Sequence, residues 1–126
     1  MINSIFNEKV IISSNELIAF NTYQATMLAP KASKSILPGQ FINILPNDLW
    51  GKVMRRPMSV SSCDGELISI IYKVVGEGTK IMSDWKKGDE VDIIGPLGNS
   101  WSNFNEKIPL IIGGGVGVAP ILFLHK

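Results

Sequence analysis

Apolar and polar residues alternate over several short stretches of this chain, which is the pattern of half-buried β-strands. The clearest stretch spans residues 66–75, with one face formed by Ile68, Ile70, Tyr72 and Val74. Its other face is partly apolar as well, so we expect both faces to be at least half covered. Further strands are predicted at residues 9–12, 17–28, 40–45, 58–62 and 90–94, the last of them ending at Gly95-Pro96.

One short helix is predicted after the strand at residues 66–75. Thr79 suits the N-cap, Gly88 suits the C-terminal stop, and one face can hold Ile81, Met82 and Trp85. Several short antiparallel strands with a single helix predict a small β-barrel or sandwich.

A glycine-rich turn follows the apolar run at residues 109–112. The turn reads Gly113-Gly114-Gly115-Val116-Gly117-Val118-Ala119-Pro120, and Pro120 falls in what would be the first turn of a helix. A strand, a glycine turn and a helix start together form a cradle for phosphate. The turn departs from G-x-G-x-x-G because Val118 stands at the third glycine's place. The sequence therefore predicts a barrel domain over residues 1–100, then a linker and the start of a truncated nucleotide-binding domain over residues 101–126.

Composition narrows the classes of function. The chain has 126 residues and a net charge of +1, so no global field favours nucleic acid or an anionic membrane. No apolar run approaches the roughly 20 residues that span a bilayer, and no signal peptide is visible, which predicts a cytoplasmic protein. Cys63 is the only cysteine, which excludes an internal disulfide and a cysteine-ligated metal centre within these residues. No metal ligand set and no catalytic residue is assigned.

Two segments could bind anions. In Arg55-Arg56-Pro57-Met58-Ser59, an arginine fork suits a phosphate, although a solvated basic turn would have the same sequence. In Gly76-Glu77-Gly78-Thr79, a glycine turn enters the predicted helix, and Thr79 could either bind an anion or only cap the helix.

The order of these segments resembles the ferredoxin–NADP reductase-like flavoprotein family. The resemblance rests on Pro38-Gly39-Gln40-Phe41, Arg55-Arg56-Pro57-Met58-Ser59, Ile71-Tyr72-Lys73, Gly76-Glu77-Gly78-Thr79, Gly95-Pro96-Leu97-Gly98-Asn99 and the turn at residues 113–120. It implies an antiparallel Greek-key β-barrel that binds FAD, followed by a Rossmann-like NAD domain. The Arg-Arg-Pro-Met-Ser version resembles the electron-transfer subunits that serve class 1B dihydroorotate dehydrogenases.

The resemblance also implies roles for single residues. Arg56 would bind the FAD phosphates, and Gly78 and Thr79 would meet the pyrophosphate. The flavin would lie beside Pro57, Met58 and Ser59. The flavin or its ribityl chain would be lined by Ile71, Tyr72 and Lys73. The nicotinamide dinucleotide would face Gly113, Gly114, Gly115, Gly117 and Pro120, in a site that these residues leave incomplete.

The function implied is electron transfer in pyrimidine biosynthesis. NAD(H) would exchange reducing equivalents with FAD, and a [2Fe–2S] centre in a part that is missing here would connect the flavin to a catalytic dehydrogenase subunit. Alternatives are a subunit of another NADH- or ferredoxin-linked complex, such as a hydrogenase or sulfite reductase, and a non-catalytic flavin-binding module. We expect this chain alone to be inactive in hydride transfer, and a homodimer could form through the unpaired edge of the strand at residues 108–112.

Overall fold

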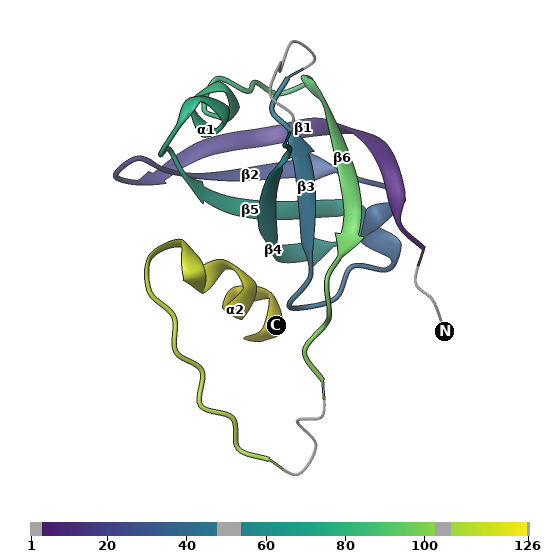
Figure 1. The fold of residues 1–126 in the computed structure, drawn as a ribbon, viewed down its shortest axis with the longest axis vertical. Helices are drawn as coiled ribbons and strands as arrows, with labels where there is room; N and C mark the ends of the chain where they lie inside the picture. Colours follow the sequence, from purple (N-terminus) through teal and green to yellow (C-terminus); the bar gives the residue numbers. More distant parts are fainter. Residues whose placement is uncertain (1–3, 48–53, 103–106, 126) are drawn as a thin grey trace.

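Six antiparallel strands close into a barrel in the computed structural model, which describes residues 4–47, 54–102 and 107–125 (Figure 1). The strands lie in the order β1-β2-β5-β4-β3-β6, so the chain leaves β2 and crosses an end of the barrel before β3 begins. This order confirms the predicted barrel. The strands are β1 Phe6–Ala19, β2 Thr22–Leu28, β3 Phe41–Leu45, β4 Arg56–Asp64, β5 Leu67–Lys73 and β6 Glu90–Leu97. The helices are α1 Glu77–Met82 and α2 Val118–His125, with 3₁₀ turns η1 Ala32–Lys34 and η2 Gly115–Gly117.

The core is built from alternate strand residues, because successive side chains of a strand point to opposite faces. The inward residues are Val10, Ile12, Ala25, Met27, Ile42, Ile44, Val60, Ile68, Ile70, Tyr72, Val91 and Ile93. Met82 and Trp85 join this core from the α1 side, and Ala32 and Ile36 join it from the η1 side. The barrel interior is therefore filled by side chains.

The buried carboxylate of Glu8 holds η1 against β1. Its two oxygens accept hydrogen bonds from the backbone N–H groups of Lys31 and Ala32, at 2.9 and 3.0 Å. These N–H groups lie at the start of η1, where no backbone partner is available, so the carboxylate satisfies them.

Several predicted strand boundaries are wrong. Residues 13–16 belong to β1, which runs unbroken from Phe6 to Ala19, and β5 ends at Lys73. The strand predicted at residues 17–28 is interrupted by the turn Phe20-Asn21, which joins β1 to β2. Asn21 has φ of 50°, a left-handed conformation that asparagine tolerates, and the turn contains neither glycine nor proline as a signal. At another boundary, β6 continues through Gly95-Pro96 to Leu97. A Cβ on Gly95 would lie 2.7 Å from Cγ2 of Ile42, so glycine is needed there because β3 packs closely, and not because the strand ends.

The helix boundaries also differ from the prediction. Helix α1 begins after Gly76, which is its N-cap, and Thr79 is its third residue. The helix ends at Met82, and Gly88 lies in the turn that precedes β6. Of the three residues predicted to share the apolar face, Met82 and Trp85 are buried, whereas Ile81 is only half-buried. Trp85 lies beyond the end of α1.

The C-terminal segment leaves the barrel and returns to it as α2, which packs against β4 (Figure 1). Ala119 is buried, and Phe123 packs against the barrel core. The strand predicted at residues 108–112 is absent: residues 107–114 form no regular structure, and Ile108 is fully exposed. A strand is stabilised by hydrogen bonds to a neighbour, and the described residues offer this segment none. The dimer through its edge stays a prediction.

Gly113 lets this extended segment approach α2. A Cβ at Gly113 would lie 2.6 Å from Cδ1 of Ile121 and 3.3 Å from Cα of Val118. Glycine at this position therefore serves helix packing.

A polar network connects β1, β5 and α1 at one end of the barrel. The Tyr72 hydroxyl donates to Oδ1 of Asn15 at 2.8 Å, and Nδ2 of Asn15 donates to the carbonyls of Met82 and Trp85 at 2.9 and 3.2 Å. Asn15 thus satisfies two carbonyls at the end of α1 and the one polar atom of the Tyr72 side chain.

We predict that Asn15→Ala lowers the free energy of unfolding by about 2–3 kcal/mol, because it leaves the Tyr72 hydroxyl and the α1 carbonyls without this partner. Tyr72→Phe removes only the hydroxyl, and we expect it to cost about 1 kcal/mol. Urea unfolding, followed by tryptophan fluorescence, measures the free energy of unfolding of both variants. Equal losses in the two variants would contradict a bridging role for Asn15.

Burial raises the pKa of Tyr72 far above its usual range, although the hydrogen bond to Asn15 opposes the shift. The unfolded chain ionises this group near pH 10, and the folded chain keeps it neutral. Stability is therefore lost as pH rises above about 10, by about 1.4 kcal/mol per pH unit for this one group. The Tyr72→Phe variant has no hydroxyl to ionise, so it should not show this loss of stability above pH 10. Chemical unfolding of both proteins between pH 9 and 11 should show parallel slopes below pH 10 and a steeper fall for the wild type above it.

Candidate functional site

The ladder between β4 and β5 closes only part of the barrel wall. Its pairs run from Asp64–Leu67 to Val60–Ile70, and a β-bulge lies between Val60 and Ser62. Beyond Val60, β4 continues to pair with β3, from Phe41–Ser59 to Ile44–Arg56. Beyond Ile70, β5 continues to pair with β2 as far as Lys73. The two strands therefore separate, and an open seam lies between residues 56–59 of β4 and residues 71–73 of β5.

Backbone groups on both strands face this seam. The N–H of Val60 donates to Gln40 on the β3 side, and the N–H of Val74 donates to Asn21 on the β2 side. Because backbone groups alternate between the two edges of a strand, those of Ser59 and those of Ile71 and Lys73 point to the seam. Pro57 shares the edge of Ser59 and has no N–H, which suits an edge that no strand pairs with. The seam offers hydrogen-bond donors and acceptors at fixed positions.

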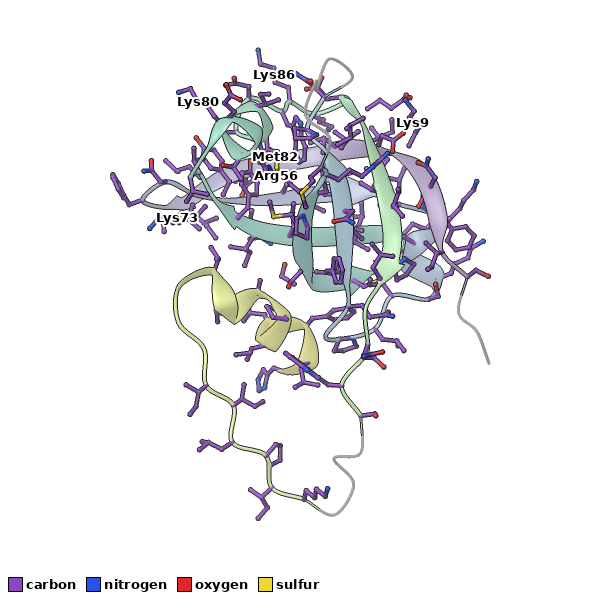
Figure 2. All side chains as sticks on the ribbon, viewed as in Figure 1. Lys9, Arg56, Lys73, Lys80, Met82 and Lys86 are labelled. Carbon is purple, nitrogen blue, oxygen red and sulfur yellow. The ribbon has the colours of Figure 1, made fainter. Side chains whose placement is uncertain are left out.

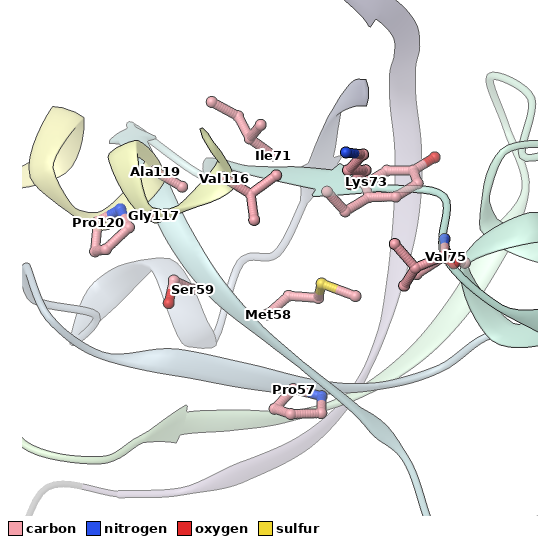
Figure 3. Close-up of a pocket in the computed structure, with 12 residues that line it drawn as sticks. Pro57, Met58, Ser59, Ile71, Lys73, Val75, Val116, Gly117, Ala119 and Pro120 are labelled. Carbon is pink, nitrogen blue, oxygen red and sulfur yellow. Dashed lines mark hydrogen bonds between the residues drawn. The ribbon is translucent and has the colours of Figure 1, made fainter. Parts of the chain in front are cut away.

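Two cavities lie along the seam, and the larger of these two has a volume of about 430 Å³ (Figure 3). One wall comes from β4, the opposite wall from β5, and a third from the start of α2. The lining residues are Pro57, Met58, Ser59, Ile71, Tyr72, Lys73, Val75, Thr79, Val116, Gly117, Ala119 and Pro120.

A smaller cavity of about 320 Å³ adjoins the larger one at the start of α1. The two share Pro57, Met58, Val75 and Thr79, so they form one continuous groove. The smaller cavity adds Arg56, Gly76 and Gly78. Every residue that the family resemblance associates with FAD thus lies along the groove, although β4, β5 and α1 are separate in the sequence.

The two adjacent arginines serve different places. Arg55 forms an ion pair with Asp92 of β6, with Nη1 2.7 Å from Oδ1, and both side chains are largely buried. Arg56 is the next residue and lines the smaller cavity, on the strand that borders the seam (Figure 2). The two arginines therefore differ in position: Arg55 is paired with β6, and Arg56 lines the groove.

The hydroxyl of Thr79 caps its own helix. Its Oγ1 accepts the N–H groups of Val75 and Gly76, at 2.9 and 3.1 Å, and lies 3.2 Å from the Gly76 carbonyl, to which it donates. The capping role of Thr79 is therefore present in the structure, and its contact with an anion stays a prediction. Thr79 fixes the backbone turn that forms the end of the smaller cavity.

Strand alternation divides the residues of β5 between core and groove. Tyr72 faces inward, is 1 % exposed and stacks on Tyr23 with ring centroids 5.6 Å apart. Ile71 is half-buried and Lys73 is exposed, so these two belong to the outer face. The outer face of β5 is covered only in part, at Ser69 and Ile71, because Leu67 and Lys73 remain exposed.

The glycine-rich turn reaches the groove only through its second half. Gly117 and Pro120 line the larger cavity, whereas Gly113, Gly114 and Gly115 do not. The sequence-based selection also missed Val75, Val116 and Ala119, which line the same cavity. Val116 and Ala119 lie inside the predicted turn, but only the return of α2 to β4 shows that they meet the barrel.

The chemistry of the groove is that of binding. The described residues that line the larger cavity include no nucleophile paired with a base, and Lys73 is the one charged side chain among them. Among residues 4–47, 54–102 and 107–125, no group of acidic, histidine or cysteine side chains could hold a metal ion. Cys63 lies outside the groove, and its thiol faces the carbonyls of Ser33 and Gly65. Burial raises the pKa of the Cys63 thiol, so this group is a poor nucleophile. In the part of the chain that the structure describes, no helix is long and apolar enough to cross a membrane.

The sequence is similar to curated electron transfer subunits of dihydroorotate dehydrogenase B (NAD(+)). The subunit of Fusobacterium nucleatum is 43% identical over 94% of this chain, and that of Caldanaerobacter subterraneus is also 43% identical over 94%. This chain covers 48% and 46% of those proteins, so it spans about half the length of the curated relatives it matches. No protein-family model matches the chain.

Solved structures share the barrel. The NADH-dependent reduced ferredoxin-NADP oxidoreductase superposes with a TM-score of 0.81 and 33% identity, over 89% of this chain and 41% of that one. Ferredoxin-NADP+ reductase from Plasmodium falciparum has a TM-score of 0.79 at 18% identity, over 94% of this chain and 51% of that one, which shows the fold alone. The chain therefore shares the barrel fold of ferredoxin-NADP reductase-like proteins, and over its length it is similar to the electron transfer subunits of dihydroorotate dehydrogenase B.

Proposed function

We propose that this chain is the FAD-binding part of an electron-transfer subunit, which passes reducing equivalents between NAD(H) and a dehydrogenase subunit that acts on dihydroorotate. The observation that carries the proposal is the open seam between β4 and β5. All nine residues that the family resemblance assigns to FAD line one groove along it. The electron-transfer role and the catalytic partner are supported by the relatives, which are electron transfer subunits of dihydroorotate dehydrogenase B.

The larger cavity fits a flavin ring in size and chemistry. Its volume of about 430 Å³ lies within the roughly 300–1,000 Å³ of small-molecule and cofactor sites. Met58, Ile71 and Val116 supply apolar surface for the faces of a planar ring, as thioethers and aliphatic side chains do elsewhere. The backbone groups of Ser59 and Ile71 supply fixed partners for heteroatoms at its edge. A bound flavin would provide exchange of two electrons with a nicotinamide and of single electrons with an iron–sulfur centre.

The smaller cavity fits the phosphates of the same cofactor. Arg56 offers a guanidinium, the preferred side chain for phosphate oxygens. Gly78 leaves the backbone at this end open to close approach, and the Thr79 cap holds its conformation. The shared residues of the two cavities would then lie between the ring and the phosphates.

We place the nicotinamide beside the start of α2. Gly117 and Pro120 line the larger cavity, so a second dinucleotide approaching along the glycine turn would reach the flavin there. In this proposal residues 1–100 are the FAD domain, and residues 101–126 are a linker and the start of the NAD domain. The rest of the nicotinamide site and the [2Fe–2S] centre belong to the length of the relatives that this chain does not match.

A second candidate partner is an NADH- and ferredoxin-linked complex. The 33% identity to the NADH-dependent reduced ferredoxin-NADP oxidoreductase favours it, because that protein shares the same barrel. The proposal for FAD is common to both candidates, and they differ in the subunit that the flavin serves. Copurification with a dihydroorotate-oxidising subunit separates them.

We expect the purified chain to bind one FAD per molecule and to show the yellow flavin absorbance. We also expect that NADH does not bleach it, because the glycines at 113–115 lie outside the groove and the strand before them is absent. Absorbance spectra before and after anaerobic addition of NADH measure this, and dithionite serves as the positive control for reduction. A chain that never binds FAD would be the empty assembly module, and bleaching by NADH would show a complete nicotinamide site.

Arg56→Ala should weaken FAD binding by about 1.5–3 kcal/mol, which is the contribution of a hydrogen bond to a charged group. Lys80→Ala is the matched control, because it removes the same charge from the exposed side of α1 without touching either cavity (Figure 2). Titration of the apoprotein with FAD, followed by quenching of flavin fluorescence, gives both affinities. An Arg56→Ala affinity equal to that of Lys80→Ala would remove Arg56 from the site.

A further inference from the structure

The charges along the groove are unevenly placed. Arg56 lies in the smaller cavity, at the end formed by α1. The larger cavity is lined by apolar side chains, hydroxyls and backbone, and Lys73 is its one charged described residue. The other ionisable group in that wall, Tyr72, is kept neutral because burial raises its pKa. A ring bound in the larger cavity would therefore have Lys73 as the one charged side chain among the described residues of its walls.

The position of Lys73 is fixed by the sheet. It is the last residue of β5, its backbone pairs with Thr22 of β2, and the next residue donates its N–H to Asn21 at 2.8 Å. Strand alternation places its side chain on the outer face with Ile71, across the cavity from Met58 (Figure 3). The backbone of Lys73 is thus fixed on the wall of the open seam, and its exposed side chain lines the larger cavity.

We propose that Lys73 sets the reduction potential of the bound flavin, by stabilising the negative charge that the ring gains when it is reduced. This inference rests on the proposed FAD site. The oxidised ring is neutral. Taking up two electrons and one proton leaves it with one negative charge, and a lysine beside it favours that state over the oxidised one. The electrons come from NADH in the complete protein and from dithionite in the experiment below.

Lys73 should differ in its effect on the reduction potential from a residue that only binds the cofactor. A contact made equally to both redox states changes affinity but not potential, whereas a charge acts on the difference between the states. The charge of Lys73 should therefore contribute little to binding of oxidised FAD, and its alkyl stem, which glutamine and arginine largely keep, lines the cavity. The contribution of the charge should appear in the ratio of the affinity for reduced FAD to the affinity for oxidised FAD.

The experiment compares Lys73→Gln, Lys73→Arg and the control Lys80→Gln in the FAD-loaded chain. Binding of oxidised FAD is measured by fluorescence titration, and the two-electron midpoint potential by dithionite reduction with a reference dye. We expect Lys73→Gln to bind oxidised FAD within about twofold of the wild type. Its relative affinity for the reduced flavin should fall about tenfold, which lowers the midpoint potential by about 30 mV. Lys73→Arg and Lys80→Gln should keep the wild-type potential.

The outcomes distinguish this inference from the proposed function. A wild-type chain that binds no FAD overturns the proposed function. If the wild type binds FAD, an unchanged potential in Lys73→Gln overturns the role of Lys73. An equal shift in Lys73→Gln and Lys73→Arg also overturns it, because the charge would then be irrelevant. Complete loss of FAD from Lys73→Gln makes Lys73 a binding residue and overturns the proposal as well.

Discussion

The site depends on the incomplete pairing of β4 with β5. A barrel of six strands would otherwise satisfy its backbone groups by closure. Here the ladder ends at Val60–Ile70, one pair beyond the bulge between Val60 and Ser62, and Pro57 removes a donor from the edge that is left open. The strands remain ordered because β3 and β2 pair with their other edges. An opening with rigid walls results, and both cavities lie along it.

The core and the groove use opposite faces of the same strands, and this couples stability to the site. Tyr72 fills the barrel interior and is bonded through Asn15 to the end of α1, while its neighbours Ile71 and Lys73 reach the groove. Arg55 is tied to Asp92 on β6, and the next residue, Arg56, reaches the smaller cavity. Each groove residue is thus placed by a neighbour that is fixed in the packed structure. A change in the core would therefore move the groove walls.

The third wall of the larger cavity comes from outside the barrel. Val116, Gly117, Ala119 and Pro120 come from the end of the chain, which returns to β4 after a long exposed segment. Ala119 and Phe123 attach it to the barrel, and the apolar residues from Ile108 to Ile112 stay in solvent. This arrangement is consistent with relatives about twice as long, since a surface so apolar is usually covered.

The sequence by itself predicted most of the strands and a barrel or sandwich, because the alternation of apolar residues depends only on neighbours along the chain. It also marked the arginine and glycine segments that line the groove, while their binding role stays a prediction. The sequence-based prediction failed at positions whose structure depends on contacts between distant parts of the chain. Gly95 signals a turn in sequence but lies inside β6, since Ile42 of the next strand leaves no room for a Cβ. Thr79 reads equally as an anion ligand or a cap, and only its bonds to Val75 and Gly76 show the cap. The apolar run at residues 108–112 reads as a strand, yet a strand requires a neighbour that the described residues do not supply. Which of two adjacent arginines reaches the groove was likewise decided by the tertiary structure, through the position of Asp92 on β6.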